Sequence, residues 1–166
     1  MPVDFYSYAE PVPTQKEFAI CDDHDQQPVR MEHIGDSEHQ VLVISNNRTD
    51  YSFIAVDHNI PLKKDDGSDD KICDAMLLTD KSVCFIEIKC WRGGTWVLKA
   101  AEQVASTIKH FNTSHPNDKH KIRDAYLCNW KQRKKIVNES RNELKSTFLK
   151  DYNTHLYIAN VIQELV

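Results

Sequence analysis

The chain has 166 residues, five cysteines and a formal net charge of −4; positions 1–80 carry 17 acidic against 6 basic residues, and positions 81–166 carry 8 against 15. A chain of this length buries a sufficient core without disulfides or a structural metal. We therefore expect a single domain over residues 1–166. The sequence shows no C-x-x-C pair typical of zinc sites and no signal peptide, so we expect free thiols in a reducing cytoplasm. It has no apolar run of roughly 18 residues, so we expect no membrane partner.

The N-terminal region begins with an extended, proline-broken segment. Thr14 and Glu17 then form the pattern of a capping box, which predicts a short helix through Ile20. Residues 21–28 (CDDHDQQP) follow as a polar loop. Four of its side chains are of types that bind metals, namely Asp22, Asp23, His24 and Asp25. Adjacent residues on such a loop are most often solvated, and we interpret these four as solvated.

Two strands are expected next, at residues 40–45 and 51–56. Asn46-Asn47 has the composition of a turn, so the second strand is expected to return alongside the first. A charged loop, residues 63–70 (KKDDGSDD), leads out of this region, and we place it near the substrate entrance.

Two apolar runs after that loop predict a β-hairpin. Residues 72–78 (ICDAMLL) and 83–87 (VCFIE) are rich in the branched and aromatic side chains of strands. The polar residues between them, 79–82, supply a tight turn. The resulting register places Met76 opposite Phe85 and, two steps further, Asp74 opposite Glu87.

Asp74 and Glu87 would then share one face of the hairpin, with Lys89 next along the same face. Opposed like charges with apolar neighbours destabilise a hairpin, and a cation between them removes this penalty. Hard oxygen ligands with room for water and phosphate suit Mg²⁺ or Mn²⁺. Lys89 would orient or help deprotonate the attacking water, or stabilise developing charge. The alternative is structural, since an E-x-K strand is most often solvated charge alternation.

A helix is expected directly after this hairpin. Thr95 is a suitable N-cap, and apolar residues recur at helical spacing from Val97 to Phe111. His115-Pro116 ends the pattern. Further on, a strand is expected at 125–128, a helix at 138–149, and a strand or helix at 155–161.

The densest basic stretch of the chain runs from Lys119 to Lys135 and includes Trp130. A basic patch with an aromatic side chain is typical of surfaces that bind phosphate backbones and bare bases. A solvated helix face is the equally weighted alternative. The candidate nucleic-acid-binding residues are Lys121, Arg123, Lys131, Arg133, Lys134 and Lys135.

Asp74, twelve intervening residues and then Glu87-Ile88-Lys89 resemble the motif of the PD-(D/E)-x-K nuclease superfamily. The similarity covers about residues 38–130, which leaves 1–37 as an N-terminal extension and 131–166 as a C-terminal basic helix and final element. Cys73 replaces the usual proline of the motif. The resemblance implies a restriction-endonuclease-like α/β fold, with a central mixed β-sheet flanked by helices.

The resemblance also implies Mg²⁺-dependent hydrolysis of phosphodiester bonds. In this resemblance, the acidic metal ligands of the family correspond to Asp74 and Glu87, and its lysine corresponds to Lys89. The backbone carbonyl of Ile88 would be a further metal ligand. Gln103 resembles a glutamine that some branches carry on the helix after the motif, although an exposed helical glutamine fits equally well. An additional acid is often supplied from before the first strand, for which Glu38 and Glu17 are the candidates.

We therefore expect an Mg²⁺- or Mn²⁺-dependent nuclease acting on DNA. Cutting both strands of a duplex would favour a homodimer, and a subunit of a larger complex is the other expected assembly. Two alternatives stay open. One is an RNA nuclease, and the other is a non-catalytic immunity or regulatory protein on the same fold, whose acidic half docks a basic partner.

Overall fold

The computed structural model describes residues 2–34, 40–132 and 141–166 and has an α/β architecture of two mixed sheets and two helices. The larger sheet has six strands in the order β1-β5-β6-β7-β8-β9, and the smaller has four in the order β10-β4-β2-β3. No helix within the described ranges is long and apolar enough to cross a membrane. The strands are β1 (Glu10–Pro11), β2 (Glu17–Cys21), β3 (Arg30–Glu32), β4 (Gln40–Ile44), β5 (Ser52–Ala55), β6 (Ala75–Leu78), β7 (Ser82–Lys89), β8 (Ile122–Asn129), β9 (His155–Ile158) and β10 (Val161–Ile162).

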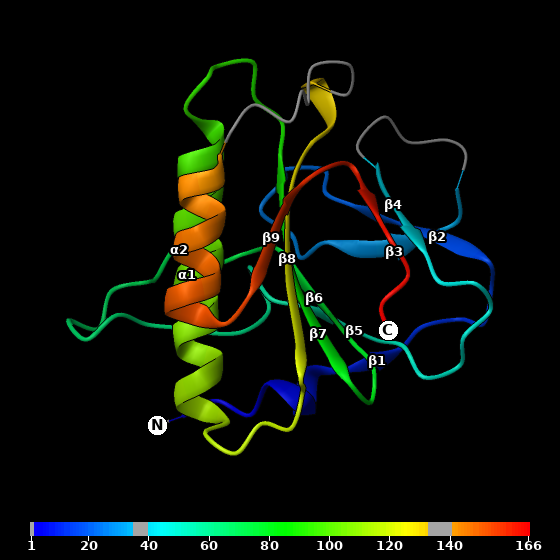
Figure 1. The fold of residues 1–166 in the computed structure, drawn as a ribbon, viewed down its shortest axis with the longest axis horizontal. Coiled ribbons are helices and arrows are strands. Elements are labelled where there is room, and N and C mark those ends of the chain that lie inside the picture. The colour runs from blue at the N-terminus through cyan, green and yellow to red at the C-terminus, as the bar shows by residue number, and fades with distance from the viewer. Residues whose placement is uncertain (1, 35–39, 133–140) are drawn as a thin grey trace.

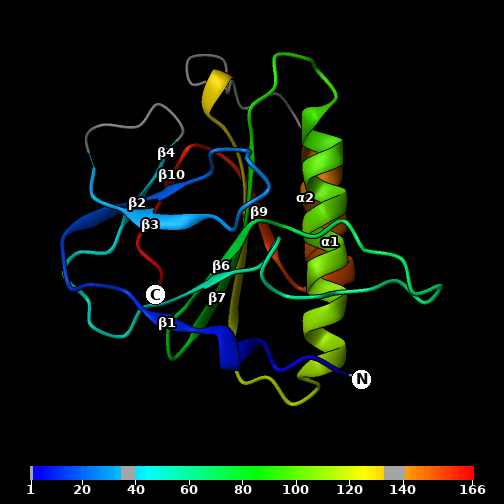
Figure 2. The same ribbon diagram turned by 180° about the vertical axis from the view of Figure 1, so that it is seen from behind.

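The helices are α1 (Trp96–Ser114) and α2 (Asn142–Tyr152), with short 3-10 turns η1 (Phe5–Tyr8) and η2 (Trp130–Gln132). Both α-helices lie on one face of the six-stranded sheet, and the four-stranded sheet lies on the other (Figure 1, Figure 2). The six-stranded sheet is therefore the middle layer of three. The expectation of helices flanking a mixed sheet holds for one face, while the second sheet that covers the other face was not predicted.

The middle layer has a hydrophobic core on each face. On the helix side, Phe85 and Met76 pack with Ile108 and Phe111 of α1. On the other side, Ile86 packs in the cluster that the second sheet completes, whose buried residues include Phe18, Ile20, Val41 and Val43. Burial on both faces explains why residues 83–88 are apolar with one interruption instead of alternating with polar residues. That interruption is Glu87, which is buried as well.

The hairpin register was predicted correctly. Met76 pairs with Phe85 and Leu78 with Val83, in antiparallel β6 and β7. β7 begins at Ser82, as expected within a residue, but β6 begins at Ala75 and not at Ile72. The backbone N–H of Cys73 donates to the Thr107 hydroxyl on α1 at 2.8 Å instead of to a neighbouring strand, so residues 72–74 lie outside the ladder.

Two predictions for the N-terminal region were wrong. Residues 17–21 form strand β2, not a helix, because their apolar side chains pair along β4 over five residues and fill the second core. The strands at 40–45 and 51–56 do form, as β4 and β5, but they belong to different sheets. The Asn46 and Asn47 N–H groups donate to the carbonyls of Lys16 and Gln15, at 2.8 and 2.9 Å, so this turn is anchored to the segment before β2 and does not close a hairpin onto β5.

Phe5–Tyr8, within the segment expected to be extended, forms η1, and strand β3 was not predicted. The helices and strands expected after residue 90 agree with the structure. The predicted helix from Val97 is α1, with Thr95 at its N-cap position, although the Thr95 side chain makes no capping hydrogen bond. The strand at 125–128 is part of β8, and the last predicted segment forms β9 and β10. The helix expected at 138–149 corresponds to α2, whose described part begins at Asn142; residues 138–140 lie outside the described ranges.

Candidate functional site

The hairpin brings Asp74, Glu87 and Lys89 together on the helix side of the middle sheet. Asp74 lies one step beyond the last paired residues of the ladder, Ala75 and Ile86, so its position faces Glu87. Glu87 shares the face of Phe85, which packs in the helix-side core. The predicted common face is therefore the observed one, and both carboxylates are buried, with 8% of Asp74 and 1% of Glu87 exposed.

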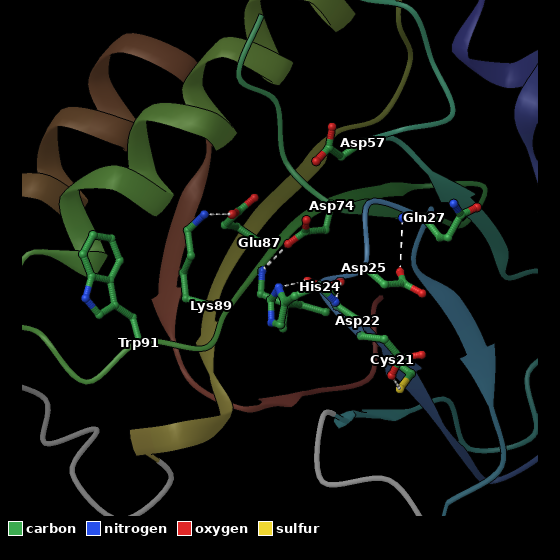
Figure 3. Close-up of polar contacts among 12 residues, drawn as sticks. Cys21, Asp22, His24, Asp25, Gln27, Asp57, Asp74, Glu87, Lys89 and Trp91 are labelled. Carbon is green, nitrogen blue, oxygen red and sulfur yellow. Dashed lines mark hydrogen bonds and ion pairs between the residues drawn. The ribbon is translucent and has the colours of Figure 1, made fainter.

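Each side chain of this group is held by defined contacts (Figure 3). The Ile88 N–H donates to Asp74 Oδ2 at 2.5 Å. The Lys89 ammonium forms an ion pair with Glu87 Oε1 and donates a hydrogen bond to Gln103 Oε1. Gln103 Nε2 in turn donates to the Ile72 carbonyl at 3.0 Å, so the amide of Gln103 links α1 to the lysine and to the segment before β6.

Burial dominates the electrostatics of the two acids. It raises the pKa of Asp74 well above its usual value, and the charges of Glu87 and Asp22 raise it further. Burial also raises the pKa of Glu87 to about 7, against the opposing effect of Lys89. For Lys89, burial alone would lower the pKa, but the carboxylates of Glu87, Asp74 and Asp22 together outweigh it and the pKa of the ammonium is raised. Lys89 is therefore a cation at neutral pH.

The group opens into a cavity of about 440 Å³ whose other wall comes from the loop between β2 and β3 and from the loop after β5. Asp22 and His24, from the polar loop after β2, line this cavity, and His24 Nδ1 lies 2.7 Å from Asp22 Oδ2. The hydrogen bond to Asp22 raises the pKa of His24. The lining residues are Asp22, His24, Gln26, Gln27, Val29, Asp57, His58, Asp74, Glu87, Ile88, Lys89, Cys90, Trp91 and Gln103.

Asp22 and His24 are the site residues that the sequence analysis missed, because it interpreted the 21–28 loop as merely solvated. Asp22 is only 7% exposed, and its charge is felt by Asp74, Glu87 and Lys89. The one signal available was that Asp22 directly follows the apolar run 18–21. Three residues on the wall have left-handed backbone, with φ of 54° at His24, 64° at Gln26 and 58° at His58. Such conformations are unfavourable for these residue types and concentrate at functional sites.

The other predicted site residues are dispersed. Glu38, Arg133, Lys134 and Lys135 lie outside the described residues. Glu17 begins β2 and is exposed. Among the basic candidates, Lys121 and Arg123 lie at the start of β8, and Lys131 lies just beyond its other end. At that other end, Asn129 pairs with Lys89 of β7. Eight residues of strand correspond to about 25 Å, so Lys131 lies at the carboxylate end of the sheet and Lys121 at the opposite end.

Arg123 is engaged in structural contacts at that opposite end. Its guanidinium donates to Asn112 Oδ1 at 2.8 Å, and lies 5.8 Å from the ring centroids of Phe85 and of Phe111. The expectation that Arg123 and the other basic residues bind nucleic acid stays a prediction. Of the described candidates, Lys131 alone follows the end of β8 that pairs with Lys89, and it does not line the cavity of the carboxylates.

The donor set fits a hard divalent cation that keeps much of its water. Among the described residues, no group of three or more His, Cys, Asp or Glu is arranged as a self-sufficient metal cage. Mg²⁺, however, is usually held by one or two carboxylates together with waters and substrate phosphates. Glu87 Oε2 is buried and has no hydrogen-bond partner among the described residues, which is the kind of orphaned oxygen that a cation would satisfy. Coordination by the Ile88 carbonyl stays a prediction.

Comparison with known proteins adds no relationship. No protein-family model matches the chain, and neither a curated protein nor a solved structure matches it. The chemistry of the site therefore has to be argued from its own residues.

Proposed function

We propose that the protein is a metal-dependent nuclease that hydrolyses phosphodiester bonds in DNA, on a restriction-endonuclease-like fold. The observation that carries the proposal is the buried pair Asp74 and Glu87, which faces a polar cavity with the Lys89 cation beside it. Two ionised carboxylates in an apolar hairpin are unfavourable when Lys89 supplies only one positive charge. A bound divalent cation would supply the missing positive charge.

In this proposal Asp74 and Glu87 hold Mg²⁺ or Mn²⁺, which when bound polarises the phosphoryl oxygen and lowers the pKa of a coordinated water. The Ile88 N–H fixes the orientation of Asp74. Lys89 is positioned by Glu87 and Gln103 and, as a cation, stabilises the negative charge that develops on the phosphate. The raised pKa of Lys89 disfavours the role of base and favours orientation of the water or charge stabilisation.

The direct test is hydrolysis of plasmid and short DNA substrates with Mg²⁺ or Mn²⁺, and with a chelator instead. We expect Asp74→Asn and Lys89→Ala each to reduce the rate by about 100-fold or more, as loss of a group that stabilises transition-state charge does. Asp124→Asn is the matched control, because burial raises the pKa of Asp124 too but this residue lies on β8 outside the cavity. Faster cleavage of RNA than of DNA would reassign the substrate.

Equal behaviour of wild type, Asp74→Asn and Lys89→Ala, with no metal dependence, would contradict the proposal. The non-catalytic interaction protein would then be the better interpretation, with the acidic half of the chain as its docking surface.

A further inference from the structure

We propose that the site takes single-stranded DNA and that Trp91 is the platform on which an unpaired base stacks next to the scissile phosphate. This inference rests on the proposed function, and it names the substrate class and a specificity residue of the same site. It starts from the position of one exposed aromatic side chain.

Trp91 combines exposure with proximity to the carboxylates. It is 38% exposed, whereas Trp96, five residues later, is 4% exposed and part of the core. Trp91 lines the same cavity as Asp74, Glu87 and Lys89. In Figure 3 it lies beyond Lys89, on the opposite side of the lysine from Asp22 and His24. A base stacked on Trp91 would therefore place its phosphate within the cavity.

The position of Trp91 is fixed by a buried hydrogen-bonding residue. Asn129, fully buried at the end of β8, donates from Nδ2 to the Trp91 carbonyl at 2.8 Å. Its Oδ1 accepts from the Trp91 N–H at 3.3 Å and from the Lys131 N–H at 3.2 Å. Gly93 lies so close that a Cβ there would be 3.0 Å from Trp91 Nε1. A platform held in this way is pre-organised and loses little entropy when a base binds.

Asn129 also joins two similar pairs at the ends of neighbouring parallel strands. Lys99 Nζ lies 4.2 Å from the ring centroid of Trp91, and Lys131 Nζ lies 5.4 Å from that of Trp130. Aromatic rings for bases and cations for phosphates are the combination by which proteins hold single-stranded nucleic acid. Trp91 follows β7, and Trp130 follows the neighbouring strand β8. Trp130 packs against the second core, so Trp91 is the ring of the two that lines the cavity of the carboxylates.

The depth of the carboxylates favours an unpaired strand. Asp74 and Glu87 are 8% and 1% exposed at the wall of a cavity of about 440 Å³, a size suited to a single small ligand. In a duplex each base is paired with the opposite strand, and each phosphate belongs to a stiff double helix. Stacking on Trp91 requires a base that has left its pair, which is cheapest where the DNA is already single-stranded.

The test measures binding without hydrolysis, in a chelator and with full-length protein. Fluorescence anisotropy compares a labelled thymidine oligonucleotide of about 12 residues with a blunt hairpin duplex. We expect the single strand to bind at least about tenfold more tightly. Trp91→Ala is expected to weaken that binding by about 5- to 100-fold, the range for loss of one base–aromatic stack, and to leave duplex binding within about twofold. Trp91→Phe should retain most of the affinity and guards against a folding defect.

A matched lysine pair on α1 tests the cation. Lys99→Ala should weaken single-strand binding and reduce its salt dependence by about one phosphate contact. Lys109→Ala, also exposed on α1 but about 15 Å further along the helix, should do neither. Tighter binding of the duplex, or an equal effect of Trp91→Ala on both ligands, would overturn the inference. Because no metal is present, failure of hydrolysis leaves this measurement unaffected, and the two proposals fail separately.

Discussion

Glu87 is a residue whose burial is unfavourable for the fold. It is 1% exposed, and its Oε2 has no hydrogen-bond partner among the described residues. Its neighbour Asp74 is also buried and has a raised pKa. Desolvation of two adjacent acids weakens the metal-free protein. We infer that this local instability is retained because a cation binds there, as strained or destabilised groups often mark functional sites.

This burial predicts a particular pH dependence of stability. The pKa of Glu87 is raised from 4.5 to about 7 on folding, so the folded state binds more protons than the unfolded state between these pH values. Stability should then fall as pH rises through that window, by at most about 3 kcal/mol. Thermal unfolding in a chelator should give a higher Tm near pH 5 than near pH 8. Because Asp74 and His24 contribute in the same direction, the test is the difference from Glu87→Gln, whose Tm should vary less with pH.

At the scale of elements, α1 fixes the segment that carries Asp74. Thr107 is fully buried; its hydroxyl accepts from the Cys73 N–H at 2.8 Å and donates to the Gln103 carbonyl at 3.0 Å. One side chain therefore positions the residue before Asp74 relative to the helix that holds Gln103. This contact takes the place of a ladder hydrogen bond at the start of β6.

Thr107→Val should therefore damage both stability and activity. It leaves the Cys73 N–H buried without a partner, which costs about 1–3 kcal/mol, and it releases the chain next to Asp74. Thr147→Val on α2 is the control, because the Thr147 hydroxyl also donates to a carbonyl four residues earlier, at 3.0 Å, but is exposed. Urea unfolding and DNA cleavage of both variants check the prediction. Equal losses in the two variants would show that Thr107 has no special role.

The difference between these elements also explains what the sequence could predict. The hairpin of β6 and β7 is local, and its short polar turn leaves one plausible register, so the meeting of Asp74 with Glu87 followed from pattern alone. The second sheet pairs β10 with β4 and β4 with β2, and these contacts are distant in sequence. The short apolar run 18–21 was the one local signal for a strand and fits a helix segment equally well, and the approach of Asp22 to the carboxylates depends on that sheet.

At the scale of the whole molecule, the middle sheet is a shared wall of both hydrophobic cores. Phe85 packs on the helix side, and Ile86, the next residue, packs on the other. Neither outer layer can keep its core if this sheet is lost. The cavity depends on all three layers, since Gln103 comes from α1, Glu87 from the middle sheet and Asp22 from the loop after β2.

We therefore predict a single cooperative unfolding transition. Urea titrations followed by far-UV circular dichroism and by tryptophan fluorescence should coincide. Phe18→Ala, which removes a fully buried ring from the second core, should shift both signals together and destabilise the protein by about 3–5 kcal/mol. Two separated transitions, or a shift of one signal alone, would mean that the second sheet unfolds independently of the site.

The proposed nuclease depends on one divalent cation shared by Asp74 and Glu87. The most direct measurement is the anomalous difference density of crystals soaked with Mn²⁺, for wild type and for Asp74→Asn. We expect one peak in the cavity, within about 2.0–2.3 Å of a carboxylate oxygen from each acid, and its loss or marked weakening in the variant. Absence of a peak at saturating Mn²⁺, or a peak that touches neither carboxylate, would contradict it.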